Sequence, residues 1–134
     1  DGLIAVSPAS DVVEAFEAAG GLGKRRLGQL HVCWADTHEQ ATKTLRDKWP
    51  IASLQGAVLS DLARPIDYEQ LTGPLPDEAI TANIVCGPDP DDHVEAIARF
   101  AAAGFTELYI HQVGDDQAGF FRFYEEAVLP RVRS

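Results

Sequence analysis

The stretch with the clearest chemical potential is FTELYIHQVGDDQ, residues 105–117, in which an apolar run ends at an imidazole and an amide. His111 and Gln112 follow Ile110, and Gly114 then interrupts the run. Because α/β proteins bind ligands at the carboxyl ends of their strands, both polar side chains are candidates for a ligand pocket. The alternative is that they cap a strand against water, and the residues alone leave both interpretations open.

Two other predicted strands end in residues that suit a pocket. Ser7 follows the apolar run Leu3–Val6, and Trp34 closes the run Gln29–Trp34. Parallel strands bring such ends to one rim, where an aromatic ring, an imidazole, an amide and a hydroxyl form a mostly apolar pocket with a few polar groups. We predict a substrate or cofactor pocket lined by Ser7, Trp34, His111 and Gln112, and we assign no catalytic residue. Ser7 also suits a simple turn, and Trp34 and His111 also suit plain packing.

The spacing of the histidines and cysteines gives little support for a metal site or for redox chemistry. His31 and Cys33 lie two residues apart, so they share one face of a strand, where packing against a helix is the better explanation. Cys33 and Cys86 are far apart in the chain and form no C-x-x-C motif, which favours reduced thiols, a cytoplasmic setting and no metal site. The GGLG run at 20–23 follows a helix instead of opening one, so it does not suit phosphate binding.

The elements that would position these residues alternate between strand and helix. The predicted strands are Leu3–Val6, Gln29–Trp34 and Glu107–His111, with a weaker one at Asn83–Cys86. Helix signals lie at about 11–20, 37–49, 90–103 and 118–129, and a long segment of mixed turns and short helices, 51–82, is predicted as an insertion. This order predicts an α/β fold with parallel strands and right-handed crossovers. Because so few strands leave open edges, we expect part of a closed barrel.

Composition narrows the classes of partner. The chain has 134 residues and a net charge of −10, so it suits one domain and opposes binding to a nucleic-acid backbone. No apolar run is long enough to span a bilayer, so no membrane partner is expected. The chain contains no methionine and opens on Asp-Gly just before an apolar run, which we interpret as a piece of a longer protein, although a trimmed N-terminus is an alternative.

Three stretches resemble one known family. DGLIAVSP, the helix opening ADTHEQA and the run from IVCGPDPDDHVEAI to GFFRFYEEAVLPRV resemble the C-terminal part of the luciferase-like flavin and deazaflavin oxidoreductases, most nearly the F420-dependent glucose-6-phosphate dehydrogenase branch. The resemblance covers essentially the whole chain. It implies a (β/α)8 TIM barrel, of which residues 1–134 are a C-terminal segment with the last three strands and the insertion 51–82.

The resemblance also implies an activity. Such enzymes transfer a hydride between coenzyme F420 and a small organic substrate, and they hold the cofactor mainly through strands that precede this segment. The parent protein is expected to be a homodimer. An FMN-dependent monooxygenase of the same fold, or a non-catalytic interaction module, are the alternatives. Ala9, Gln70 and approximately Ala82 stand where sugar-phosphate enzymes of the family place cations, so glucose 6-phosphate is not the expected substrate.

Overall fold

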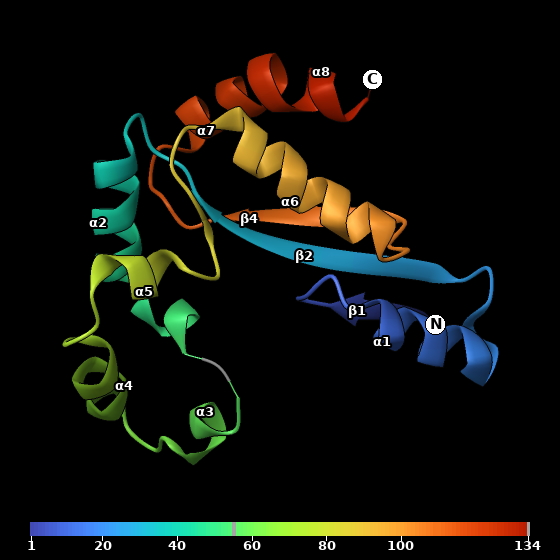
Figure 1. Cartoon of the computed structure of the whole chain (residues 1–134), viewed down its shortest axis with the longest axis horizontal. Helices are drawn as coiled ribbons and strands as arrows, with labels where there is room; N and C mark the ends of the chain where they lie inside the picture. Colours follow the sequence, from blue (N-terminus) through green and yellow to red (C-terminus); the bar gives the residue numbers. More distant parts are fainter. Residues whose placement is uncertain (55, 134) are drawn as a thin grey trace. The chain divides into compact units, whose positions relative to one another are not determined.

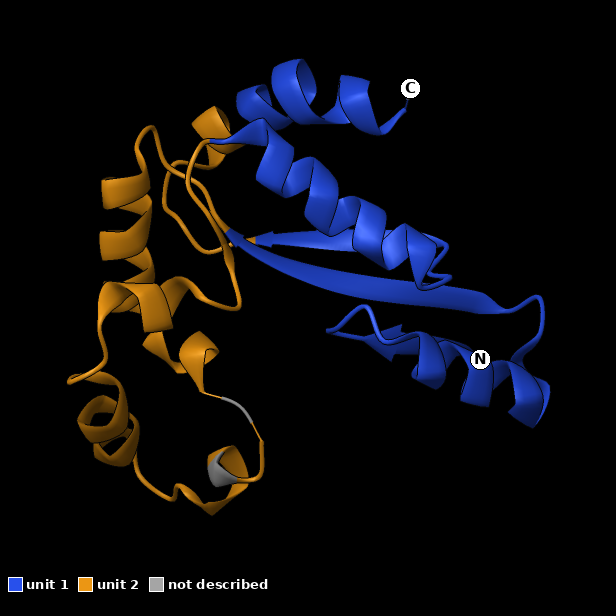
Figure 2. Ribbon diagram, in the orientation of Figure 1, with its two compact units in different colours: residues 1–32, 89–111, 121–134 blue, residues 33–88, 112–120 orange. Residues whose placement is uncertain are grey.

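The computed structural model describes residues 1–54 and 56–133, and these form two compact units (Figure 2). The first unit contains residues 1–32, residues 89–111 and the C-terminal stretch from Phe121; the second contains residues 33–88 and 112–120. Gln55, which falls within the predicted insertion 51–82, lies outside the described residues, as do Ser134 and the side chain of Val58.

Strand β2 (Arg25–Cys33) is the centre of the sheet in the first unit (Figure 1). Strand β1 (Gly2–Ala5) pairs with it in parallel, with Gly2 opposite Arg25 and Ala5 opposite Gly28. Strand β4 (Glu107–Gln112) also pairs with β2. Arg25 contacts Glu107 near the start of both strands and His31 contacts His111 near their ends, so β4 runs parallel to β2 as well. The expected α/β class with parallel strands is confirmed.

Strand β2 begins earlier than the predicted start at Gln29. Its first residues, Arg25 and Arg26, are charged, so the start of the strand is not recognised when the sequence is read for apolar runs. Both arginines form ion pairs with carboxylates: Arg25 Nε donates to Glu107 at 2.7 Å, and Arg26 pairs with Glu17.

Helix α6 (Pro90–Ala102) packs on this sheet where Gly28 leaves room for it. A Cβ atom at Gly28 would lie 2.5 Å from the ring of Phe100 on α6 and 2.8 Å from Leu108 on β4. The start of α6 agrees with prediction, because the Asp89 side chain accepts the N–H of Asp91 at 2.9 Å and Pro90 takes the first helical position. The buried apolar side chains of this unit are Val13, Leu30, Val32, Ala96, Phe100, Phe105, Tyr124 and Val128.

Several strand side chains of the first unit remain exposed. Along β4 the exposure alternates as the two-residue period of a strand requires. Tyr109 is 59% exposed and His111 is exposed, whereas Leu108 and Ile110 are half-buried. The other helical segments of the unit flank the sheet or close the chain: α1 (Ser10–Phe16), a π-helical turn η1 (Glu17–Gly21), a second π-helical turn η3 (Tyr124–Val128) and α8 (Leu129–Val132).

The C-terminal helix continues beyond the predicted end near residue 129. Helix α7 (Gln117–Phe123) passes through η3 into α8, and Pro130 lies in the first turn of α8. Proline is tolerated there because the first-turn N–H groups have no intrahelical acceptor.

The second unit is organised around helix α2 (His38–Lys48). Thr37 caps the helix by accepting the N–H of Gln40 at 3.2 Å. Strand β3 (Val85–Cys86) pairs with the last residue of β2 through a hydrogen bond from Gly87 N–H to the Cys33 carbonyl at 3.0 Å. The core of this unit comprises Cys33, Ala41, Leu45, Ile80 and Cys86.

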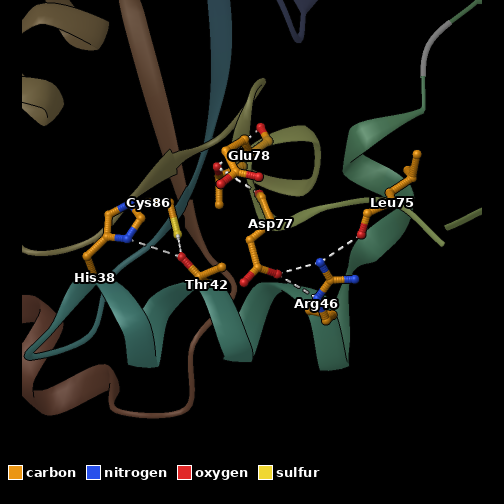
Figure 3. Close-up of polar contacts among 8 residues, drawn as sticks. His38, Thr42, Arg46, Leu75, Asp77, Glu78 and Cys86 are labelled. Atoms are coloured by element: carbon orange, nitrogen blue, oxygen red, sulfur yellow. Dashed lines mark hydrogen bonds and ion pairs between the residues drawn. The ribbon is translucent and has the colours of Figure 1, made fainter. Parts of the chain in front are cut away.

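The predicted insertion forms a series of short helices in the second unit. These are η2 (Pro50–Ser53), α3 (Val58–Asp61), α4 (Pro65–Thr72) and α5 (Asp77–Thr81). Arg46 on α2 holds the entry to α5, because its Nε donates to Asp77 at 2.8 Å and its Nη2 donates to the Leu75 carbonyl at 2.9 Å (Figure 3).

Candidate functional site

The four residues predicted to line a pocket fall into two groups. Ser7 and His111 belong to the first unit, whereas Trp34 and Gln112 belong to the second. Ser7 is exposed in the bend after β1, and its carbonyl accepts the N–H of Ala9 at 2.9 Å. His111 lies near the carboxyl end of β4. The structure therefore places both at strand ends, as predicted.

His111 forms a pair with His31, a residue for which the sequence had suggested only packing. The Nδ1 atoms of the two rings are 3.0 Å apart, and the rings meet edge to face with centroids 5.2 Å apart. At this distance one Nδ1 donates a hydrogen bond and the other accepts it, which requires that at least one ring be neutral. The pair thus holds a single proton between its Nδ1 atoms.

The environment of the pair favours the neutral form of His31. Burial lowers the pKa of His31 below its ordinary value of 6.5, and the charge of a protonated His111 lowers it further. His31 is half-buried, whereas His111 is exposed. A neutral histidine pair with one exposed member is suited to accepting a proton from a bound molecule near neutral pH.

Trp34 and Gln112 contact each other in the second unit. The Trp34 N–H donates to Gln112 Oε1 at 2.9 Å, and Gln112 Nε2 donates to the Trp34 carbonyl at 2.9 Å. Both side chains are buried, with 8% of each exposed. Gly119 allows the indole to approach, because a Cβ atom there would lie 2.7 Å from the ring. Gln112 therefore uses its amide on the backbone, so any role in a pocket would come through the position of Trp34.

Within the described residues, no group of three or more His, Cys, Asp or Glu side chains is arranged to hold a metal ion. The described part of the chain also contains no helix that is both long and apolar enough to cross a membrane.

A surface hollow of about 520 Å³ lies on the C-terminal helices of the first unit. Its lining includes Phe121, Leu129 and Arg133, and none of the predicted pocket residues contributes to it. The hollow therefore gives no support to the predicted pocket.

Sequence reasoning missed the partner of each histidine and cysteine in these units. The pairing of His31 with His111 depends on the register between β2 and β4, and Cys33 and Cys86 meet because β3 pairs with the end of β2. The only signal in the sequence was the position of each residue near the end of an apolar run.

Comparison with known proteins finds no matching protein-family profile but several related enzymes. The chain is 36% identical over 107 residues to the F420-dependent glucose-6-phosphate dehydrogenase of Microbacterium testaceum, which is 80% of this chain and 32% of that enzyme. It is 32% identical over 106 residues to the enzyme of the same name from Beutenbergia cavernae, covering 79% of this chain and 31% of that enzyme. The chain spans about a third of the length of these relatives.

A solved structure supports the fold. The chain is similar to an F420-dependent secondary alcohol dehydrogenase in complex with an F420–acetone adduct, with a TM-score of 0.67 and 19% identity. The similarity covers 99% of this chain and 42% of that one. The expected fold, the C-terminal part of a (β/α)8 TIM barrel, is confirmed.

Proposed function

We propose that this chain, which belongs to the luciferase-like, F420-dependent oxidoreductase family, is the C-terminal part of an enzyme that transfers a hydride between coenzyme F420 and a small organic substrate. In this proposal residues 1–134 are a C-terminal segment of the barrel domain, and 51–82 is an insertion in it. The single observation that carries the proposal is the His31–His111 pair near the carboxyl ends of two parallel strands. Ligands of barrel enzymes bind at that end.

Two exposed residues of the first unit, Ser7 and His111, carry groups that can hydrogen-bond to a deazaflavin ring. Such a ring presents carbonyl oxygens and ring nitrogens, and the His111 imidazole and the Ser7 hydroxyl can donate or accept hydrogen bonds. Both are exposed at strand ends. Trp34 and Gln112 hydrogen-bond to each other within the second unit, so we assign them no direct contact with the ring. The coenzyme supplies the acceptor or donor of the hydride, and the rest of its binding is assigned to preceding strands.

The part of the chemistry that we assign to this chain is proton transfer. Oxidation of an alcohol releases the hydroxyl proton, and a neutral imidazole is a base of suitable strength near pH 7. The lowered pKa of His31 keeps its ring neutral at that pH. The pair therefore accepts the proton in the oxidation direction and returns it in the reduction direction.

For the substrate, we propose an uncharged alcohol or carbonyl compound in place of a sugar phosphate. Ala9, Gln70 and Ala82 stand where the related enzymes are expected to place cations, and none can offer a phosphate a charge-assisted hydrogen bond. The fold neighbour acts on secondary alcohols by name, which supports this class. The two relatives described above are named for F420, so FMN and a non-catalytic role are not favoured.

We also propose that the whole protein is a cytoplasmic homodimer. The free thiols of Cys33 and Cys86 suit a reducing compartment, and the dimer is implied by the family resemblance. Analytical ultracentrifugation of the complete protein tests the dimer, and a monomer at micromolar concentration would refute it.

The decisive experiment mixes the complete protein with coenzyme F420 and follows the deazaflavin absorbance with a series of secondary alcohols and with glucose 6-phosphate. Turnover is expected with at least one alcohol and not with the sugar phosphate. Binding of FMN instead of F420 would overturn the coenzyme assignment, and rapid turnover of glucose 6-phosphate would overturn the substrate class.

Variants test the role of the histidine pair. His111→Gln is expected to lower kcat for alcohol oxidation by about 100-fold, the usual range for loss of a general base, while coenzyme affinity changes little. In the unaltered enzyme kcat/KM is expected to stay level down to pH 6.5 and to fall below it, because the pKa of His31 lies under that value. Glu95→Gln, on the exposed Glu95–Arg99 ion pair of α6, is the control with unchanged activity. An unchanged kcat in His111→Gln would exclude the pair from proton transfer.

A further inference from the structure

The second unit brings together the two cysteines of the chain. Cys33 is the last residue of β2 and Cys86 is the last residue of β3, and both lie in one core cluster with Ala41, Leu45 and Ile80. Cys33 is 0% exposed and Cys86 is 9% exposed. The hydrogen bond from Gly87 N–H to the Cys33 carbonyl joins the two strands at the cysteines themselves.

The strand geometry suits a covalent bond between these residues. Neighbouring strands are about 4.8 Å apart. Disulfides join residues whose Cα atoms are about 4.4–6.8 Å apart. Because Gly87 directly follows Cys86 and both cysteines face the same core cluster, the bond from Gly87 to Cys33 leaves the two cysteines opposite each other on one face of the sheet. A disulfide at this place needs little movement of the backbone.

A chain of polar contacts leads from the surface to Cys86. Thr42 on α2 lies with its Oγ1 3.8 Å from Cys86 Sγ and 3.3 Å from Nδ1 of His38 (Figure 3). Thr42 is buried, whereas His38, the first residue of α2, is exposed. The ring of His38 also lies against Gly87, since a Cβ atom there would be 3.2 Å from His38 Cδ2. Protons can therefore pass between the sulfur region and the surface by way of Thr42 and His38.

The two thiols are electrostatically unequal. The neighbouring Cys33 side chain lowers the pKa of Cys86, and the Thr42 hydroxyl lowers it further, against the opposing effect of burial. The pKa of Cys33 is raised, first by its interaction with Cys86 and then by burial. Cys33 also contacts the Ala41 carbonyl, 3.2 Å from its Sγ. Cys86 is thus the more acidic of the two thiols, while the S–H of Cys33 is held by the Ala41 carbonyl.

We propose that Cys86 and Cys33 are a reversible dithiol–disulfide site, in which Cys86 reacts first with a peroxide and Cys33 then closes the bond. This inference does not depend on the proposed oxidoreductase activity. It assigns a modification site to the core of the second unit, with hydrogen peroxide as the oxidant class small enough to reach a sulfur that is nearly buried.

The reaction balances in two steps. The Cys86 thiolate attacks one peroxide oxygen, so an S–O bond forms, the O–O bond breaks, and hydroxide leaves and takes up the thiol proton as water. The Cys33 sulfur then attacks Cys86 sulfenic acid, so the S–S bond forms, the S–O bond breaks, and the second water leaves with the Cys33 proton. Two electrons pass from the two thiols to one peroxide. A small dithiol reverses the bond by thiol–disulfide exchange.

The competing interpretation is that the cysteines are inert core residues. Buried free cysteines commonly act as small apolar side chains. The contact between the thiols, the approach of Thr42 and the link to exposed His38 distinguish this pair from that common case.

The first test is an equilibrium measurement that needs no variant. The chain is equilibrated with mixtures of oxidised and reduced dithiothreitol, in buffer and in concentrated urea, and free thiols are then alkylated and counted by mass spectrometry. If the fold holds the sulfurs ready to bond, the native chain forms the Cys33–Cys86 disulfide at least about tenfold more favourably than the unfolded chain, a difference of about 30 mV. A disulfide that is less favourable in the native chain than in urea would overturn the proposal.

The second test resolves the order of the steps with peroxide. In Cys33→Ser, Cys86 is expected to stop at the sulfenic acid, which a cyclic diketone probe traps; in Cys86→Ser, Cys33 is expected to stay unmodified. Thr42→Val should slow the reaction of Cys86 at neutral pH by roughly threefold for each unit by which the pKa rises, because a smaller thiolate fraction is partly offset by a more nucleophilic thiolate, and Thr42→Ser should restore the rate. Equal reactivity of Cys33 and Cys86 in these variants would overturn the assigned order.

Discussion

The side chain of Gln112 hydrogen-bonds to the backbone of Trp34 as a neighbouring strand would. Its amide accepts the N–H of Trp34 and donates to the carbonyl of the same residue, both at 2.9 Å; Trp34 directly follows β2, and Gln112 is the last residue of β4. Gly114 is required beside it, because a Cβ atom there would lie 2.7 Å from Gln112 Nε2 and 2.9 Å from the Trp34 carbonyl. The local backbone of Trp34 is therefore set by one buried amide.

We expect Gln112→Leu to lower the free energy of unfolding by about 2–4 kcal/mol, because two buried backbone groups lose their partners. Urea denaturation measures the change. The matched control is Gln117→Leu, since Gln117 also donates to a carbonyl, that of Gly114 at 2.7 Å, but is itself exposed. That substitution should lower the free energy of unfolding by less than about 1 kcal/mol. Equal losses in the two variants would show that the hydrogen bonds from Gln112 to the Trp34 backbone contribute no more to stability than the exposed hydrogen bond of Gln117 does.

At the scale of the elements, the contact of α6 with the sheet depends on a residue without a side chain. Gly28 on β2 lies under the ring of Phe100 on α6, with Leu108 of β4 at its side. A two-residue strand period alone would place a large apolar residue here, and the close approach of the ring explains why glycine is present instead.

Gly28→Ala is expected to destabilise the chain by about 1–3 kcal/mol through overpacking against Phe100. The smaller, more flexible side chain of Phe100→Leu should relieve part of this clash. In a double-mutant cycle the two substitutions should therefore cost less together than the sum of their separate effects, by more than about 0.5 kcal/mol. Additive effects within that margin would mean that Gly28 and Phe100 do not constrain each other.

At the scale of the whole molecule, the parallel strands expose apolar side chains that such sheets normally cover. Ile4 on β1 is 72% exposed and Tyr109 on β4 is 59% exposed, and Val6, directly after β1, is 65% exposed. Parallel sheets are usually covered on both faces. In the longer enzyme proposed above, the remaining barrel strands would provide that cover.

The chain alone is therefore expected to bind an apolar fluorescent dye, whereas the complete enzyme should bind much less per molecule. The double variant Ile4→Thr with Tyr109→Thr should reduce dye binding by the chain alone. Leu22→Thr is the matched control, because Leu22 is 78% exposed but lies outside the strands. If the complete enzyme binds as much dye as the chain, the exposed strand side chains are not covered by further barrel strands.

Local sequence patterns determined much of this protein. The Asp89-Pro90 start of α6, the cap of α2 at Thr37, the strand at Glu107–Gln112 and the α/β order were all predictable, because capping chemistry and apolar periodicity act over a few residues. The family was also recognisable from contiguous stretches of sequence. The charged start of β2 at Arg25 was not, since its partner Glu107 is remote in the chain.

Only the tertiary structure decided which residues meet. His31 pairs with His111, Cys33 with Cys86 and Trp34 with Gln112, and in each case the partners come from distant parts of the sequence. Their meeting depends on which strands pair and in what register, and a shift of one residue would turn each side chain to the opposite face. Periodicity identifies a strand but does not specify its neighbour, so the sequence could propose the ends of the strands as functional and could not name the pairs.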